Sequence, residues 1–215
     1  MIVVGSLLVL ALFLVTGWAI ATEMFQQRSW RRRVESGDPR IVAALIEEAM
    51  AAWRRARPPR GLPAALWAGV QGAQLVAVTE DSASLSASAE AEFRTEEGRR
   101  VQVASALDEA MSLASRIVDM LLYDVPNLRL ETVRVDVYST FAAEDEAPVQ
   151  RPILTTTAGR PEADAMTWEA MTPSEILGRF ETRYLRTPSG QAAPIDLPPV
   201  EGEPPMPGPR PEMTE

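Results

Sequence analysis

The sequence predicts an α+β protein with an N-terminal single transmembrane helix, an antiparallel or mixed sheet of about five strands with helices on one face, and a disordered Pro-rich C-terminal tail. Three observations predict this fold class. Residues 2–21 form an uncharged apolar stretch, residues 83–93 alternate between apolar and polar side chains, and residues 107–122 carry one apolar stripe at helical spacing. Helices and strands follow in the order α-β-β-β-α-β-β-α, which favours helices gathered on one face of a sheet. We divide the chain into an anchor (1–23), a basic juxtamembrane segment with an amphipathic helix (24–60), an α+β domain (61–186) and a tail (187–215).

The apolar stretch at residues 2–21 predicts a membrane anchor. A helix of this length reaches about 30 Å, the hydrocarbon thickness of a typical bilayer. A cleaved signal peptide is the alternative, because Ala19-Ile20-Ala21 has the form of a cleavage site, but a signal peptide carries a positive segment before a shorter apolar run. The arginines that follow act as topology determinants and face the anionic lipids of the cytoplasmic leaflet; they are Arg28, Arg31, Arg32 and Arg33. We therefore expect a single-pass protein of the cell membrane with a cytoplasmic C-terminal domain.

The first soluble element is an amphipathic helix that begins after Asp38-Pro39, an N-cap followed by proline at the first helical position. Its apolar residues recur at helical spacing until Pro58-Pro59. This apolar face can pack on the domain, lie on the membrane surface or bind a partner, and packing on the domain is the default. Residues 57–69, rich in proline and glycine, read as a stiff connector without regular structure.

Strands follow the connector. Residues 74–78 predict one strand, and the alternation over residues 83–93 predicts a second, with serines and glutamates on a face that we interpret as solvated. A turn at residues 96–99 leads into a short third strand at 100–104.

The second half of the domain begins with a helix capped by Ser105, whose apolar stripe predicts the core helix over the sheet. Residues 130–141 and 152–157 predict two more strands. Pro161 opens a short helix, and Thr172-Pro173-Ser174-Glu175 is a capping box that opens the last one. The inner face of that last helix is predicted from Ile176, Leu177, Phe180 and Tyr184.

From Thr187 onward, nine of 29 residues are proline, which predicts a disordered, partly polyproline tail. Residues 204–211 contain PxxP spacing that suits docking to an aromatic groove, although a plain solubilising terminus has the same composition. The candidate partner-binding residues are Trp53, Pro204, Pro207 and Arg210.

Composition excludes most catalytic chemistry. The chain has no Cys, His or Lys, so cysteine and histidine nucleophile pairs, ordinary zinc sites and Schiff bases are excluded. A carboxylate enzyme, with or without Mg²⁺ or Ca²⁺, would draw on a scattered set of acids and one tyrosine: Glu90, Glu92, Asp124, Glu131, Asp136 and Tyr138. No cofactor, catalytic or metal motif is present, and the net charge of −9 disfavours nucleic-acid binding.

These observations predict a membrane-anchored, non-enzymatic binding, scaffolding or accessory protein with an unidentified protein partner. The alternatives are a membrane-anchored carboxylate-dependent hydrolase and an exported domain held by an uncleaved signal anchor. An enzyme should show a cleft where acids converge with raised pKa values.

Overall fold

The computed structural model describes residues 38–96, 98–141, 147–202 and 204–205. The fold is α+β, with a mixed sheet of six strands, a separate two-stranded hairpin and helices. Several predicted features lie outside the described residues: the apolar stretch 2–21, the four topology arginines (Arg28, Arg31, Arg32 and Arg33), Pro207 and Arg210. Among the helices that are described, none has the length and hydrophobicity needed to cross a bilayer.

The six-stranded sheet has the order β1-β2-β5-β6-β7-β8. Its strands are β1 (Gln74–Val78), β2 (Ser82–Ser88), β5 (Thr132–Phe141), β6 (Val149–Gly159), β7 (Glu181–Arg186) and β8 (Ala192–Ala193). Neighbours are antiparallel except β2 and β5, which are parallel. A parallel pair needs a crossover connection, and here the crossover contains the hairpin and the long helix α4. The sheet is therefore mixed, which is one of the two predicted forms.

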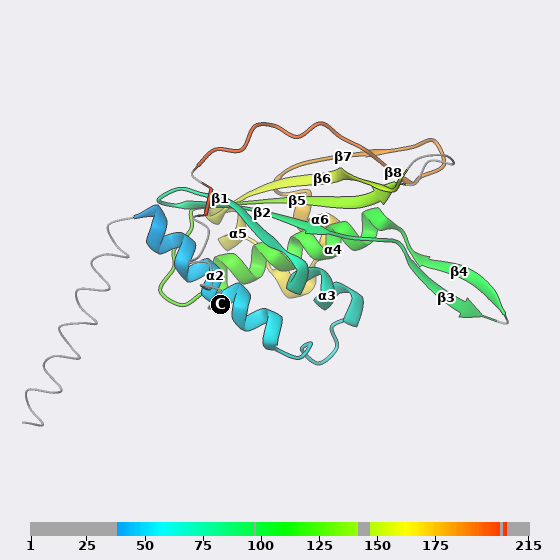
Figure 1. The fold of residues 1–215 in the computed structure, drawn as a ribbon, viewed down its shortest axis with the longest axis horizontal. Coiled ribbons are helices and arrows are strands. Elements are labelled where there is room, and N and C mark those ends of the chain that lie inside the picture. Colours follow the sequence, from blue (N-terminus) through cyan, green and yellow to red (C-terminus); the bar gives the residue numbers. More distant parts are fainter. Residues whose placement is uncertain (1–37, 97, 142–146, 203, 206–215) are drawn as a thin grey trace, which may run out of the picture.

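The helices lie along one side of the sheet in Figure 1, and the C-terminal segment runs over the other side. Their bounds are α2 (Pro39–Arg55), α3 (Ala64–Gly72), α4 (Ala106–Asp119), α5 (Arg160–Asp164) and α6 (Pro173–Leu177). A π-helical turn, η1 (Met120–Asp124), continues α4, and a 3-10 turn, η2 (Trp168–Ala170), precedes α6.

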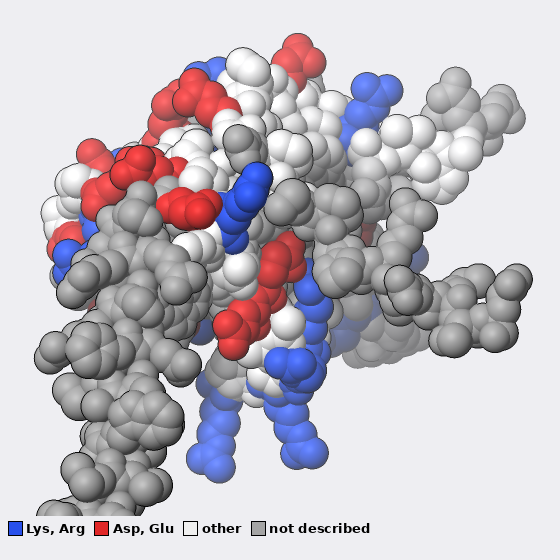
Figure 2. All heavy atoms as spheres, turned by 60° about the vertical axis from the view of Figure 1, so that its left-hand side comes forward, with Lys and Arg blue, Asp and Glu red and all other residues white. Residues whose placement is uncertain are grey.

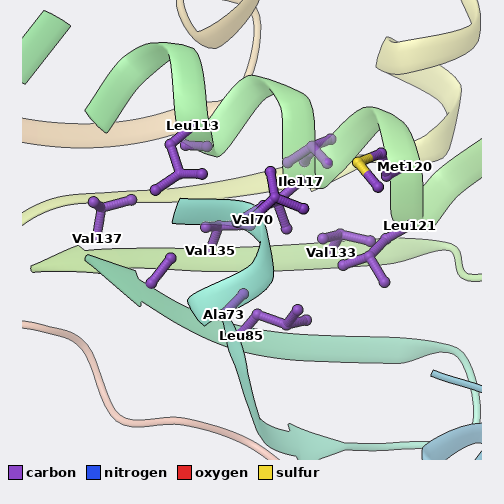
Figure 3. Packing of buried hydrophobic residues seen from close by; sticks show 14 of the residues in the cluster. Val70, Ala73, Leu85, Leu113, Ile117, Met120, Leu121, Val133, Val135 and Val137 are labelled. Atoms are coloured by element: carbon purple, nitrogen blue, oxygen red, sulfur yellow. The ribbon is translucent and has the colours of Figure 1, made fainter. Parts of the chain in front are cut away.

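The core lies between α4 and the middle strands of the sheet. Figure 3 shows Leu113, Ile117 and Leu121 of the α4 and η1 segment directed toward Val133, Val135 and Val137 of β5, with Val70 and Leu85 beside them. Ser105 caps α4 by accepting a hydrogen bond from the Asp108 amide, and Asp108 and Glu109 occupy the first turn, where negative charge is favourable. The prediction of α4 as the core helix is confirmed.

Helix α2 packs on the domain. Asp38 accepts a 2.9 Å hydrogen bond from the Arg40 amide, and Val42, Ile46 and Met50 are buried toward β1 and α3. The apolar face of α2 is thus already covered, so this face is not available to the membrane surface. Trp53 is half-buried against the same core.

The prediction of a connector without regular structure is wrong for its second half, because α3 begins at Ala64. The prolines stand before the helix, with Pro63 at the N-cap, and a proline before the first turn does not interrupt helical hydrogen bonding. Trp67 fixes α3 against α2 by donating from its indole nitrogen to the Ala56 carbonyl at 3.1 Å.

The predicted strand at residues 83–93 is two strands. β2 ends at Ser88, and the chain leaves the sheet to form the hairpin of β3 (Glu92–Glu96) and β4 (Arg99–Ala104). The Glu90 carboxylate holds the departure point by accepting from the Ser139 hydroxyl at 3.1 Å and the Thr140 amide at 2.9 Å. The hairpin turn contains Gly98 at φ +77°, a conformation that glycine adopts without steric cost.

The last predicted helix is shorter than expected. The capping box at Thr172 and Glu175 is present, but α6 ends at Leu177, and Tyr184 lies exposed on β7 instead of on an inner helical face. Gly178 ends the helix, and the alternating residues after Phe180 pair with β6.

The tail also differs from the prediction of disorder from Thr187. β8 pairs with β7, and residues 194–202 then cross the polar side of the sheet; we call these nine residues the strap. Hydrogen bonds from Arg134 of the sheet to the strap explain why this proline-rich segment is held.

Candidate functional site

Polar side chains form one face of the sheet. The parallel register places Ser84 beside Arg134 and Ser86 beside Asp136, while the residues between them belong to the core. Asp136 in turn stands opposite Thr155 of β6. The interpretation of this face as solvated is wrong at its centre, because the strap covers it.

A buried ion pair lies at the centre of the face. The Arg134 guanidinium makes a two-pronged contact with the Asp136 carboxylate, at 3.0 Å from both Nε and Nη2. The Thr155 hydroxyl donates to the same carboxylate at 2.5 Å. Arg134 is 8% exposed, Asp136 4% and Thr155 3%. Such a forked arrangement is the strongest geometry for an arginine–carboxylate pair.

The strap supplies the remaining acceptors of Arg134. Its Nη1 donates to the Pro199 carbonyl and its Nη2 to the Pro198 carbonyl, both at 2.9 Å. At one end of the strap, the Ile195 amide donates to the Pro152 carbonyl at 2.9 Å. At the other end, the backbone of Gly202 lies so close to the Val78 carbonyl that a Cβ would be 2.5 Å from its oxygen. The strap therefore spans the sheet from β6 to β1.

The chemistry of the contact suits proline. Arginine has five N–H donors and no acceptor, whereas a proline residue has a carbonyl acceptor and no N–H donor. A Pro-Pro pair can thus lie across Arg134 without leaving an amide N–H unpaired over the sheet.

Burial and the nearby Asp136 raise the pKa of Tyr138 on the same face, so its hydroxyl stays neutral at physiological pH.

Space remains beside the strap. A hollow of about 560 Å³ lies beside the strap and is lined by Arg183, Tyr184 and Ile195, among others. A second, of about 220 Å³, lies over β1, β2 and β5 beside Tyr138. Because these hollows leave little apolar contact between the strap and the sheet, hydrogen bonds hold the strap in place. Its apolar contacts come from three half-buried residues: Ile195, Leu197 and Pro198.

A groove of about 620 Å³ lies on the other side of the molecule, between α3, α4 and the base of the hairpin. Glu90, Glu92 and Glu109 line it together with Arg100. Partial burial, then Glu92 and Asp108, raise the pKa of Glu109. The described residues contain no cluster of three or more acids that is arranged to hold a metal ion. A carboxylate-dependent reaction in this groove would have three acids to draw on: Glu90, Glu92 and Glu109.

The predicted site residues do not form one site. Of the candidate partner-binding residues, Trp53 is half-buried on α2 and Pro204 is exposed. Among the candidate acids, Asp136 is paired with Arg134, Glu131 lies at the surface before β5, and Asp124 lies 3.6 Å from Arg116.

Sequence reasoning missed Arg134, Thr155 and the Pro198–Pro199 pair. One signal was present: Arg134 and Asp136 stand two residues apart in a strand that alternates with valine, so both belong to one face.

Comparison of the chain with known protein families, with curated proteins and with solved structures gives no match.

Proposed function

We propose that this protein is a membrane-anchored, non-enzymatic binding protein whose cytoplasmic domain recognises an extended proline-rich segment on its polar sheet face. The observation that carries the proposal is the pair of hydrogen bonds from Arg134 to consecutive proline carbonyls of the strap. In this view the strap is a ligand supplied by the same chain, and a proline-rich segment of a partner protein replaces it.

Three features support a replaceable strap. Its contacts with the sheet are few, cavities lie beside it, and proline-rich chains are extended before they bind, so little conformational entropy is lost on docking. A tethered strap is also present at high effective concentration, so a free competitor binds weakly unless the strap is loosened.

The anchor and its flanking charge support attachment at the membrane. The apolar stretch 2–21 is followed by four arginines, and four more, Arg54, Arg55, Arg57 and Arg60, are exposed at the end of α2 and just after it. Figure 2 shows basic side chains extending from the lower part of the domain, where α2 ends in Figure 1, with acidic side chains above them. A reporter fused to the C-terminus tests the orientation, and finding it outside the cell would contradict a cytoplasmic domain.

Peptide binding tests the recognition itself. The full chain in mild detergent is titrated into a fluorescent peptide with the sequence APIDLPPVEGE, residues 193–203, and anisotropy is followed. Gly202→Ala loosens the strap end, so this variant should bind the peptide more tightly than the wild type does. The double variant Arg134→Leu/Asp136→Leu removes the donors and should abolish binding.

Two controls make the result specific. A peptide with glycine in place of Pro198 and Pro199 should bind less well, because a flexible chain loses more entropy on docking. Two outcomes would show that the face is a structural contact for the strap alone. One is equal binding by Gly202→Ala with and without the Arg134→Leu/Asp136→Leu changes, and the other is no binding by Gly202→Ala at millimolar concentration.

A further inference from the structure

Positive charge gathers where α2 ends. Residues 49–79 contain no acid, and their charged residues are all arginines: Arg54, Arg55, Arg57 and Arg60. All four are exposed, and we call them the arginine patch. The ion pairs within the described residues belong to other arginines: Arg116, Arg134, Arg183 and Arg186. The arginine patch is therefore a positive surface without a counter-charge in the described part of a chain whose net charge is −9.

The arginine patch is not needed to cap α2. Basic side chains near the C-terminal end of a helix often donate to its last carbonyls. Here the Gln71 side chain of α3 takes that role, with its amide nitrogen 3.1 Å from three carbonyl oxygens, those of Trp53, Arg54 and Ala56. Arg54 donates to the Ala73 carbonyl at 3.2 Å. The other three guanidinium groups of the patch donate to no acceptor among the described residues, so they are available to a ligand.

The backbone that carries the arginine patch is held in place. Trp67 donates from its indole nitrogen to the Ala56 carbonyl at 3.1 Å, which fixes the end of α2 against α3. In the connector that follows, Pro58-Pro59 restricts φ, and the Pro59 carbonyl accepts from the Leu62 amide at 3.2 Å. A backbone that is ordered before binding loses little conformational entropy when a ligand binds.

The chain before α2 determines which anion the arginine patch meets. The apolar stretch 2–21 is the proposed membrane anchor, and residues 22–37 join it to α2. Sixteen residues span at most about 55 Å, and the 17 residues of α2 form a helix about 25 Å long. The patch can therefore reach the surface of the bilayer that holds the anchor. Anionic lipids of that bilayer have a far higher effective concentration at the patch than a soluble polyanion has.

We propose that the arginine patch binds anionic lipid headgroups and attaches the domain to the membrane at a second point. This contact rests on the proposed function, because the anchor brings the patch to the bilayer. Guanidinium groups donate to phosphate and carboxylate oxygens, and a phosphatidylserine headgroup offers both. The apolar face of α2 is buried in the domain, so the contact is electrostatic and lies among the headgroups.

A contact at the arginine patch also determines which face of the domain points away from the membrane. Figure 1 shows the connector between α2 and α3 at the bottom of the molecule and the strap at the top, on the other side of the sheet. When the connector lies on the bilayer, the polar sheet face and its strap point away from the lipid. The proposed peptide-binding face then stays accessible to a partner.

Quenching by lipid tests the contact in the full chain, because a chain without cysteine accepts a fluorophore at one introduced cysteine. Ala56→Cys places the label within the arginine patch, and Ser189→Cys places it in the exposed turn between β7 and β8. Each labelled chain is inserted into vesicles of phosphatidylcholine that contain a headgroup spin-labelled lipid as quencher. A second set of vesicles contains roughly one quarter phosphatidylserine, which supplies the negative surface potential of a cytoplasmic leaflet.

We expect phosphatidylserine to increase quenching of the label at position 56 and to leave the label at position 189 unquenched. Raising the salt from about 0.1 M to 1 M shortens the Debye length from about 10 Å to 3 Å and should abolish this increase. The variant Arg55→Gln/Arg57→Gln/Arg60→Gln should lower the ratio of docked to undocked domain about a hundredfold, since each arginine near an anionic surface contributes about fivefold. Its urea unfolding midpoint should not change, because the three side chains are exposed.

The hairpin supplies a matched control with the same change in net charge. Arg94→Gln/Arg99→Gln/Arg100→Gln also removes three exposed arginines and should keep the quenching at position 56. Equal quenching at position 56 in the two kinds of vesicle, or equal loss in the two triple variants, would overturn the proposal. Binding of a fluorescent RNA oligonucleotide that the patch variant loses, without quenching by lipid, would assign the patch to nucleic acid instead.

The anchor and the arginine patch can fail separately. Release of the full chain from the vesicles by an alkaline carbonate wash would contradict the anchor and with it the proposed function. A chain that resists the wash but shows no phosphatidylserine-dependent quenching at position 56 would contradict the lipid contact alone.

Discussion

The buried pair of Arg134 and Asp136 permits a sharp test of the energetics of the polar sheet face. We consider Arg134→Leu, which removes the guanidinium and leaves the Asp136 carboxylate, 4% exposed, with the Thr155 hydroxyl as its remaining side-chain partner. Removing one member of a buried ion pair costs about 3 to 5 kcal/mol, because the other charge stays desolvated. The variant should therefore lose a large part of the stability of a domain that has about 5 to 15 kcal/mol in total.

The double variant Arg134→Leu/Asp136→Leu separates the ion pair from the strap. Replacing both members with apolar side chains of similar size is often neutral or stabilising in protein interiors. The two hydrogen bonds to the Pro198 and Pro199 carbonyls are lost in both variants. We therefore expect the double variant to be more stable than the single one by about 2 kcal/mol or more.

Urea unfolding of the full chain in mild detergent, followed by tryptophan fluorescence, measures both differences. Arg183→Leu is the control. Arg183 of β7 stands opposite Thr155 of β6 and pairs with Glu181 at 2.6 Å. Both side chains of this pair are more than half exposed. An exposed pair contributes about 0 to 1 kcal/mol. A cost below about 1 kcal/mol for Arg134→Leu, or a double variant no more stable than the single one, would refute the buried-charge reasoning.

Four further predictions concern the cap of α6, the pH dependence of that cap, a tyrosine and the strap. Thr172→Ala should cost about 1 kcal/mol by removing the cap of α6. Hydrogen bonds from Thr172 lower the pKa of the Glu175 carboxyl below its ordinary value of 4.5. Ionised Glu175 therefore stabilises the fold above pH 4.5. The difference in melting temperature between the wild type and Glu175→Ala should disappear as the pH falls through the lowered pKa. Burial and the hydrogen bond to Asp164 raise the pKa of Tyr123 to about 12, so its stabilisation should be lost between pH 10 and 12, and Tyr123→Phe should remove the highest transition from an ultraviolet titration. Gly202→Ala should speed hydrogen exchange at the Ile195 amide of the strap without moving the unfolding midpoint. The reason is that Gly202 has φ +113° and no room for a Cβ beside Val78. An unchanged exchange rate would contradict the role of Gly202 in holding the strap on the sheet.

The elements that sequence reasoning predicted correctly are those whose signals are local. The N-caps at Asp38, Ser105 and Thr172 each lie within three residues of the amide that they accept from, so a short stretch of sequence contains the whole interaction. The apolar stripe of α4 is likewise contained in one helix, and it packs on the sheet as expected.

The elements that were wrong have patterns compatible with two structures. Ile176, Leu177, Phe180 and Tyr184 fit the spacing of one helix face, and they also fit a short helix followed by a strand. Only the pairing of β7 with β6 decides between them, and that pairing joins residues 24 to 30 apart in the chain. For α3, the prolines that indicated a connector are placed before the helix, where they do no harm.

The candidate site was harder to predict because its parts are far apart. Arg134 and the strap carbonyls are separated by 64 and 65 residues. Alternation along β5 assigns Arg134 and Asp136 to one face of the sheet but says nothing about what covers that face. The choice between a solvated and a covered face therefore depended on a segment that composition had assigned to disorder.

Proline content was interpreted as an obstacle to structure, yet it is the property that lets the strap lie over Arg134. A segment of ordinary residues in this position would bring amide N–H groups over a guanidinium that has only donors. Those N–H groups would have to compete for the Asp136 carboxylate, which already accepts from Arg134 and Thr155. Pro198 and Pro199 bring carbonyls without N–H groups. The same composition thus predicts disorder when the tail is considered alone, and it predicts contact with the sheet when it is considered beside a buried arginine. In the structure, residues 194–202 make this contact, because Arg134 donates to the Pro198 and Pro199 carbonyls.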